Sequence, residues 1–267
     1  MCSTGTSIGR PNGRDFRLLT QCAQRLDCDG FEFMMYDSWY GRIGEVREFM
    51  LRFPAPVPVV HCEKGVGEYI SRNEPGDTDE AVRLFEINCA LARDIGARTL
   101  VLHLWNGVHS DRNIGCNIGL CRQLMDRAAE YGLTLTVENV VCSVQDPMTH
   151  MLRLMEVCPD VQFTFDTKMA EFHRQLDRLY TDEGRRLFRH VRHMHINDYL
   201  GGYRDWGSLR TLHVGGGQVD FDRLFAFVKE TGYEGDFTVE ATSFGADGAI
   251  DFDALNRDFE RIRAYLG

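Results

Sequence analysis

Short runs rich in Val, Thr, Phe and Leu alternate along the chain with longer segments whose apolar residues recur at helical spacing. The strand-like runs cover residues 3–9, 30–36, 57–61, 99–104, 133–139, 161–166, 191–197 and 236–241. The middle runs are apolar along most of their length, which is typical of parallel strands that are buried on both faces. The pattern therefore predicts a parallel sheet covered by helices.

The segments between these runs carry the helical pattern. In residues 15–26, Phe16, Leu19 and Cys22 fall on one face. Further helices are expected at residues 77–95, 119–131, 147–157, 221–230 and 252–266. Strands and helices in alternation predict an α/β fold, a single-domain (β/α)8 TIM barrel spanning residues 1–267. An open doubly wound sheet is the alternative, but no Gly-x-Gly-x-x-Gly motif follows the first strand.

Composition and charge narrow the functional classes. The chain has 267 residues, of which 43% are hydrophobic, and its formal net charge is −10, which disfavours general binding to nucleic acid or anionic membranes. No stretch approaches the roughly 20 apolar residues of a membrane span, and no signal peptide is recognisable at the start, so we expect a cytoplasmic protein. The nine cysteines form no CxxC pair, which favours reduced thiols over disulfides.

Four consecutive strand-like runs end in a residue that can bind a cation. These residues are Glu138, Asp166, His195 and Glu240. The carboxyl ends of barrel strands converge on one face, where three carboxylates repel one another unless protons or a cation lie between them. The pattern predicts one divalent metal held by these four side chains. Each acid alone could instead cap a helix or pair with a surface arginine.

Short motifs at the strand ends and in one glycine-rich turn carry a family resemblance. They are Asp29-Gly30-Phe31-Glu32, Val137-Glu138-Asn139, Asp166, His195-Ile196-Asn197-Asp198, Gly215-Gly216-Gly217-Gln218-Val219-Asp220-Phe221 and Val239-Glu240. Through these motifs the chain resembles, over nearly its whole length, the xylose isomerase-like TIM barrels. That family includes sugar and sugar-phosphate isomerases, ketose 3-epimerases and endonuclease IV, and the motifs are most similar to those of the ketose 3-epimerases.

The resemblance implies that Glu138, Asp166, His195 and Glu240 bind the metal, and that Glu138 and Glu240 are also the catalytic acid and base. Three carboxylates and one imidazole suit Mn²⁺, with Mg²⁺, Co²⁺ and Zn²⁺ as alternatives. The implied activity is isomerisation or epimerisation of a sugar or sugar phosphate, by proton transfer next to a carbonyl through a metal-bound enediolate. A keto-sugar dehydratase or lyase on the same site, and a non-catalytic sugar-binding barrel, stay open.

Polar residues near the same strand ends are expected to bind the substrate. They are Glu32, His61, His103, Asn139, Lys168, Asp198 and His213. The N–H groups of the turn at residues 215–217 are a candidate phosphate site. Trp39, Trp105 and Trp206 are expected in loops, where they could stack on a sugar ring or pack the loops.

The chain departs from the family at Met169, where a histidine often contacts substrate or a second metal. Lys168 offers a polar group beside it, or is a solvated helix residue. Endonuclease IV uses three metals and a larger histidine-rich set, so Met169 and the negative net charge argue against DNA repair. The expected partner is a small sugar or sugar phosphate, without nucleic acid or membrane, and a homo-oligomer stays open.

Overall fold

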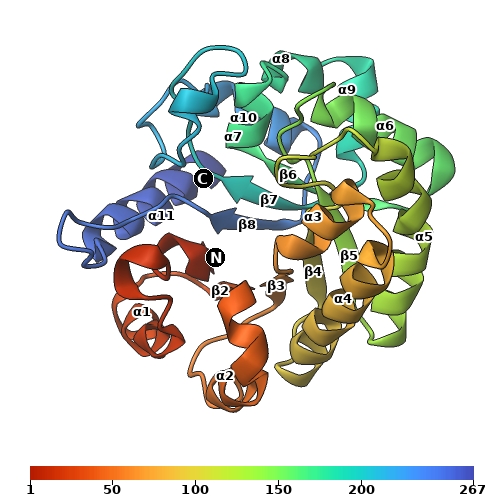
Figure 1. Ribbon diagram of the computed structural model, residues 1–267. Helices are drawn as coiled ribbons and strands as arrows, with labels where there is room; N and C mark the ends of the chain where they lie inside the picture. Colours follow the sequence, from red (N-terminus) through yellow and green to blue (C-terminus); the bar gives the residue numbers. More distant parts are fainter. The chain divides into compact units, whose positions relative to one another are not determined.

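The computed structural model describes residues 1–267 and has eight strands in the order of a closed barrel, β1 to β8 (Figure 1). They are β1 (Cys2–Ser3), β2 (Phe31–Met34), β3 (Val59–His61), β4 (Thr99–Leu102), β5 (Thr134–Glu138), β6 (Gln162–Asp166), β7 (Val191–Ile196) and β8 (Asp236–Val239). The predicted (β/α)8 TIM barrel is confirmed, and the open-sheet alternative is wrong.

Eleven α-helices accompany the strands. They are α1 (Leu19–Arg25), α2 (Ile43–Met50), α3 (Gly65–Arg72), α4 (Asp77–Asp94), α5 (Ile114–Glu130), α6 (Pro147–Val157), α7 (Thr167–Phe172), α8 (Leu176–Leu179), α9 (Asp182–Phe188), α10 (Phe221–Glu230) and α11 (Phe252–Leu266). Five short 3-10 turns are η1 (Thr4–Thr6), η2 (Arg10–Asn12), η3 (Phe16–Leu18), η4 (Asp37–Arg42) and η5 (Trp206–Ser208). All six predicted helices are present, whereas α2, α3, α7, α8 and α9 were not predicted.

The chain forms two compact units, each built from segments that are not consecutive. The first unit contains Met1–Glu32, Phe53–Pro56 and Asp166–Gly267, and the second contains Phe33–Arg52 and Val57–Phe165. Parallel pairing joins β1 to β2, β1 to β8 and β7 to β8 in one set, and β3 to β4, β4 to β5 and β5 to β6 in the other. One domain over the whole chain stays a prediction.

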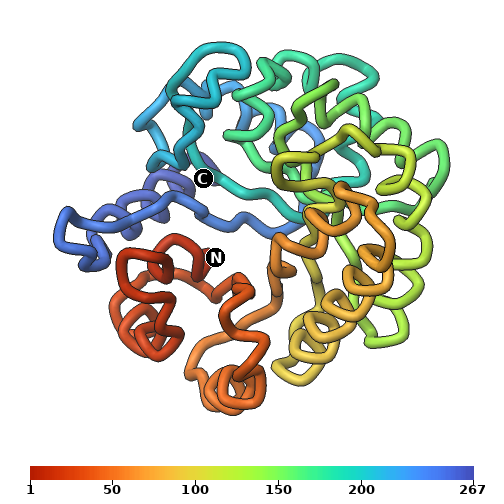
Figure 2. Tube along the Cα trace, viewed as in Figure 1, coloured from red at the N-terminus to blue at the C-terminus, as the bar shows by residue number.

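In the first unit, β1 lies between β2 and β8 and sets their register. Ser3 pairs with Glu32, Cys2 pairs with Val239, and His195 on β7 pairs with Thr238 on β8. By this register Glu32 and the residue after Val239 lie at the same level, whereas His195 lies at the level of Thr238, two residues earlier on β8. The chain's first and last segments also lie side by side (Figure 2), since the Asp27 N–H donates to Asn256 Oδ1 at 2.9 Å.

In the second unit, helix α3 approaches the end of β4 closely. A Cβ atom at Gly67 would collide with the His103 carbonyl, so only glycine permits this contact. The nine cysteines form no disulfide. None of the helices combines the length and the apolar character of a membrane span.

Candidate metal centre

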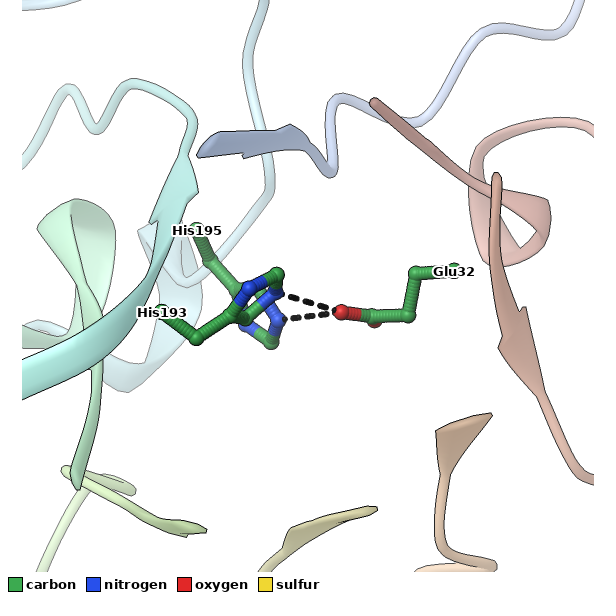
Figure 3. A group of neighbouring side chains, drawn as sticks. All are labelled: Glu32, His193 and His195. Atoms are coloured by element: carbon green, nitrogen blue, oxygen red, sulfur yellow. Dashed lines mark hydrogen bonds and ion pairs between the residues drawn. The ribbon is translucent and has the colours of Figure 1, made fainter. Parts of the chain in front are cut away.

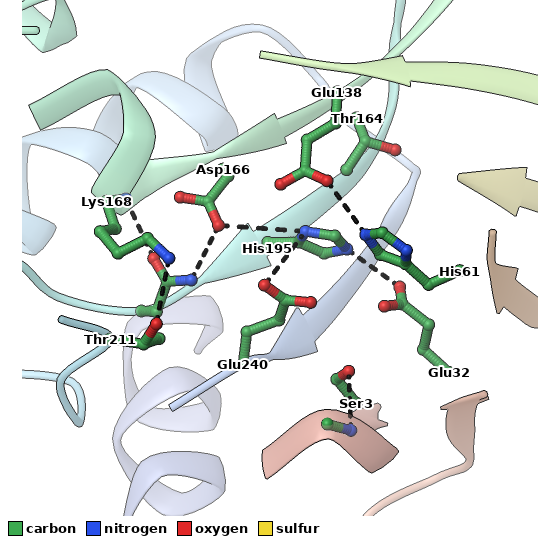
Figure 4. A network of polar contacts seen from close by, with 12 residues as sticks. Ser3, Glu32, His61, Glu138, Thr164, Asp166, Lys168, His195, Thr211 and Glu240 are labelled. Carbon is green, nitrogen blue, oxygen red and sulfur yellow. Dashed lines mark hydrogen bonds and ion pairs between the residues drawn. The ribbon is translucent and has the colours of Figure 1, made fainter. Parts of the chain in front are cut away.

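His195 on β7 lies beside two carboxylates of the first unit. Its Nδ1 is 3.5 Å from Glu240 Oε2 and 4.0 Å from Asp166 Oδ2 (Figure 4). Ligand atoms about 2.0–2.2 Å from one ion are roughly 3–4 Å from each other, so these spacings are those of neighbouring ligands. Glu240, the residue directly after β8, also has a buried Oε1 without a hydrogen-bond partner. The group therefore offers an unsatisfied carboxylate oxygen where a cation would be expected.

Glu32 fixes the orientation of His195 from the other edge of the ring. Its Oε2 accepts hydrogen bonds from Nε2 of His195 at 3.0 Å and Nε2 of His193 at 2.7 Å (Figure 3). Burial alone would raise the pKa of Glu32, but the charge and hydrogen bonds of His195 and His193 lower it well below its usual value. An ionised Glu32 only accepts, so Nε2 of His195 carries the hydrogen that it donates, while its other nitrogen, Nδ1, faces Asp166 and Glu240.

Asp166 ends β6 and caps α7 with the same side chain. Its Oδ1 accepts the Met169 N–H at 2.7 Å, and its Oδ2 accepts Nδ2 of Asn197 at 2.8 Å. The same Oδ2 lies 4.0 Å from Nδ1 of His195. Asp166 is therefore a helix cap, as the sequence allowed, and also a neighbour of His195.

Glu138, the last residue of β5, is buried against two histidines of the second unit. Nε2 of His61 lies 3.2 Å and Nε2 of His103 lies 2.8 Å from Glu138 Oε2. At the far edges of these rings, Nδ1 of His61 is 2.8 Å from the Cys62 carbonyl, and Nδ1 of His103 is 3.2 Å from Oδ1 of Asn106. The Nε2 atoms of both imidazoles thus contact the same carboxylate oxygen.

Each of these rings faces acceptor oxygens at both edges. A carbonyl and an ionised carboxylate both only accept, so a neutral His61 ring, with a single N–H, can donate to the Cys62 carbonyl or to Glu138 but not to both. Asn106 uses its Nδ2 to donate to a carbonyl at 3.2 Å, so its Oδ1 is the acceptor that faces Nδ1 of His103. Burial lowers the pKa of His103 to about 4, so that ring is neutral. His61, His103 and Glu138 therefore form a second group able to hold a cation.

The other predicted substrate residues differ in what they contact. Lys168 is only 7% exposed and donates from Nζ to Thr211 Oγ1 at 3.0 Å, so its alternative as a solvated helix residue is wrong. Asn139 is buried directly after Glu138. His213 is partly exposed, and its Nδ1 is 2.6 Å from a carboxylate oxygen of Asp258.

Asp198 organises the glycine-rich turn. Its Oδ1 accepts the N–H groups of Tyr199 and Val219, and its Oδ2 accepts the N–H of Gly217 at 2.8 Å. The N–H of Gly216 donates to a carbonyl of the same turn. The expectation that this turn offers its N–H groups to a phosphate is therefore wrong for Gly216 and Gly217. These hydrogen bonds account for Asp198 without a substrate.

The three tryptophans divide between core and surface. Trp39 and Trp105 are buried, and Trp105 donates to the Val140 carbonyl at 2.9 Å, so both pack loops, while Trp206 is 51% exposed. Two residues that complete the site, His193 and Asn197, were not predicted. The His-x-His alternation on β7, which places both rings on one face, was the signal for His193.

Comparison with known proteins agrees with this architecture. The profile of the xylose isomerase-like TIM barrel family matches residues 21–263, while a search of curated proteins found no match. A D-tagatose 3-epimerase-like protein has a similar fold, with a TM-score of 0.70 and 18% identity over 99% of this chain and 96% of that one.

Two further solved structures are similar at 15% identity, each over 99% of this chain and 96% of the other. They are D-allulose 3-epimerase from Methylomonas sp. in complex with D-allulose, with a TM-score of 0.73, and the IOLI protein with a bound zinc atom, with a TM-score of 0.72. At such identities these likenesses show the fold. Because the family profile covers most of the sequence, the chain belongs to the xylose isomerase-like TIM barrel family.

Proposed function

We propose that this protein is a divalent-metal-dependent isomerase or epimerase of a sugar or sugar phosphate, and that Glu138, Asp166, His195 and Glu240 hold its ion. The observation that carries the proposal is that Nδ1 of His195 lies 3.5 Å from Glu240 Oε2 and 4.0 Å from Asp166 Oδ2, the spacing of neighbouring ligands of one cation. Membership of a family with isomerase and epimerase members, and the likeness to ketose 3-epimerases, support the reaction class.

The pairing of β5 with β6 supports a metal centre that includes Glu138. Glu138 pairs in register with Thr164, and the hydroxyl oxygens of Thr136 and Thr164 are 2.8 Å apart. Alternate residues of a strand point to the same side, so Glu138 shares the side of Thr136, and Asp166 shares that of Thr164. We infer that the two acids end neighbouring strands on one side of the sheet.

The donors fit such an ion. Three carboxylates and one imidazole suit Mn²⁺, Mg²⁺, Co²⁺ or Zn²⁺, and the buried, unpartnered Oε1 of Glu240 is an oxygen that a cation would satisfy. When bound, a divalent ion polarises a carbonyl and a neighbouring hydroxyl and so acidifies the C–H bond between them. We assign to Glu32 the role of holding the tautomer and orientation of His195.

Glu138 and Glu240 are the proposed acid and base. Each is a carboxylate at a strand end, able to take a proton from carbon or return one. Removal on one face and return on the other inverts the carbon, whereas return to the neighbouring carbon exchanges ketose for aldose. Asn139 and His213 are proposed contacts for substrate hydroxyls. A lyase on a keto sugar would use the same two acids but release a second product.

Solvent deuterium incorporation into a panel of ketoses, measured on Mn²⁺-loaded protein, tests the proposal. We expect Glu138→Gln to bind Mn²⁺ more weakly but, once saturated with the ion, to slow exchange by about 10²–10⁴-fold. His195→Ala should lose the ion itself. Glu230→Gln, a substitution at an exposed residue of α10, is the matched control and should change neither the Mn²⁺ affinity nor the exchange rate. Equal exchange in wild type and Glu138→Gln would remove that glutamate from the mechanism.

The histidine pair on Glu138 favours one second candidate, a two-ion centre that hydrolyses a phosphate ester. Metal content separates the candidates. One ion per chain with exchange into a ketose supports the isomerase. Two ions, one of them lost in His103→Ala, with no exchange into any sugar, support the hydrolase. One ion with no exchange favours a lyase or a sugar-binding role.

A further inference from the structure

A single cationic side chain is buried in this protein. Of the 30 lysines and arginines, Lys168 is the only one in the interior, at 7% exposure. Arginines that pair with acids do so near the surface, as Arg72 does with Asp77 and Arg47 with Asp94. Lys168 is therefore the exception among the basic residues, and its burial requires an explanation.

No carboxylate pairs with Lys168. Its Nζ donates to the neutral hydroxyl of Thr211 at 3.0 Å, and its main-chain N–H donates to Oδ1 of Asn197 at 3.0 Å. An ammonium group has three hydrogens to donate, and the Thr211 hydroxyl accepts only one of them. Because a buried charge without a counter-ion is costly, an anion at Nζ would stabilise this arrangement.

The same amide group connects Lys168 to the proposed metal centre. Asn197 Oδ1 accepts the Lys168 N–H, while Asn197 Nδ2 donates to Asp166 Oδ2 at 2.8 Å. Lys168 follows Asp166 by two residues in the first turn of α7, and its side chain extends toward Thr211 (Figure 4). The cation thus lies beside the centre on a well-fixed element.

We propose that Lys168 binds an anionic group, a phosphate or a carboxylate, on the sugar that this protein converts. The inference rests on the proposed function and names the substrate class of that site: sugar phosphates or sugar acids rather than neutral sugars. The turn that contains Gly216 and Gly217 uses those N–H groups internally, so it does not compete for this role. Thr211 holds the ammonium in place for the ligand.

A competing role for Lys168 is to offset the negative charge of Asp166 and Glu240. In that case Lys168→Met would change Mn²⁺ affinity and leave anion binding alone. If Lys168 binds the substrate, the same variant weakens the binding of anions and leaves neutral sugars unaffected. The two roles are therefore separated by which ligand the variant loses.

The test is calorimetric titration of the full-length, Mn²⁺-loaded protein with inorganic phosphate, D-gluconate and D-allulose. We expect Lys168→Met to weaken phosphate or gluconate binding about tenfold or more, since a charge-assisted hydrogen bond is lost, with D-allulose unchanged. The wild-type preference between the two anions identifies phosphate or carboxylate. Arg210→Met removes one charge at the exposed residue next to Thr211 and should have no effect, whereas Lys168→Arg should restore part of the affinity.

An anion can also bind directly to the Mn²⁺ ion, and this contribution is the same in all variants. The ratio of anion affinity between wild type and variant therefore measures the contribution of Lys168. Equal anion affinity in wild type and Lys168→Met, or an equal loss in Arg210→Met, would overturn the inference. If Lys168→Met does not fold, Lys168→Gln takes its place under the same criteria. If the wild-type protein does not bind Mn²⁺, or catalyses no deuterium exchange, the proposed function is refuted instead.

Discussion

Two groups of potential ligands in this protein each combine an aspartate and a histidine with a third residue. Asp166, His195 and Glu240 lie in the first unit and are called the metal cluster after their proposed role, and Asp111, Cys142 and His150 form the loop cluster in the second unit. In each cluster the potential ligand atoms lie within 4.8 Å of one another. By residue type alone, either could be taken for a metal site.

The clusters differ in what their carboxylate oxygens already bind. Asp111 accepts the N–H groups of Ser143, Val144 and Gln145 at 2.7–2.8 Å, together with Nε2 of His150 at 2.9 Å. A cation there would have to displace these donors. In the metal cluster, Glu240 keeps one oxygen without a donor. The unpartnered oxygen of Glu240, rather than composition, therefore distinguishes the metal cluster from the loop cluster.

The largest effect we expect is on stability, from Asp111→Ala. The variant leaves buried donors of the loop after β5 without their acceptor, which should lower the free energy of unfolding by about 3–5 kcal/mol. Denaturant unfolding at pH 7 measures this. The matched control is Asp220→Ala, which removes an exposed helix cap and should cost about 1 kcal/mol.

The stabilisation by Asp111 should also depend on pH. Burial alone would raise its pKa, but hydrogen bonds from His150 and the loop N–H groups hold the pKa below the ordinary 3.8. A lowered pKa means that the stabilisation is fully present above pH 3.8 and is lost as the pH falls toward the folded-state value. The difference between wild type and Asp111→Ala should be constant from pH 7 to pH 5 and should shrink below pH 4. A difference that grew on acidification would contradict this assignment.

The elements of the fold differ in how far the sequence could predict them. The ends of α6, α10 and α11 were predicted to the residue, and each of these helices begins directly after a capping aspartate, as α6 does after Asp146. Helix α7 was missed because all six of its residues are buried, so it has no polar face that would reveal a helical period. Strand β1 is shorter than predicted, because residues 4–6 continue as the 3-10 turn η1.

For the site, the sequence predicted which residues lie at strand ends but not which side chains form hydrogen bonds with them. The alignment of strand ends predicted Glu138, Asp166 and His195 as ligands, and that role stays a prediction. The hydrogen bond that makes Glu32 a support for His195 joins residues 163 positions apart, and no local pattern reports such a contact. The burial of Lys168 likewise depends on Thr211, 43 residues later.

A second, smaller effect concerns metal affinity. Both Glu32 and Asp111 accept a hydrogen bond from a histidine Nε2, but only Glu32 supports a ring whose other nitrogen faces the metal cluster. Glu32→Gln should weaken Mn²⁺ binding by about 10–100-fold. Asp111→Asn, which changes the matching carboxylate of the loop cluster, should leave Mn²⁺ affinity unchanged. Equal losses in both variants would show that general charge, rather than orientation of His195, sets the affinity.

The smallest effect is expected from Cys142→Ser. Nδ1 of His150 is buried without a partner, so the loop cluster does contain one available nitrogen, and a soft ion such as Zn²⁺ would need the Cys142 thiolate to complete a site. Because the Asp111 carboxylate is engaged by the loop, we expect zinc content, measured by mass spectrometry after dialysis, to be the same in wild type and Cys142→Ser. A loss of one zinc per chain in the variant would make the loop cluster a metal site, and hydrogen-bond saturation would then fail to distinguish the two groups.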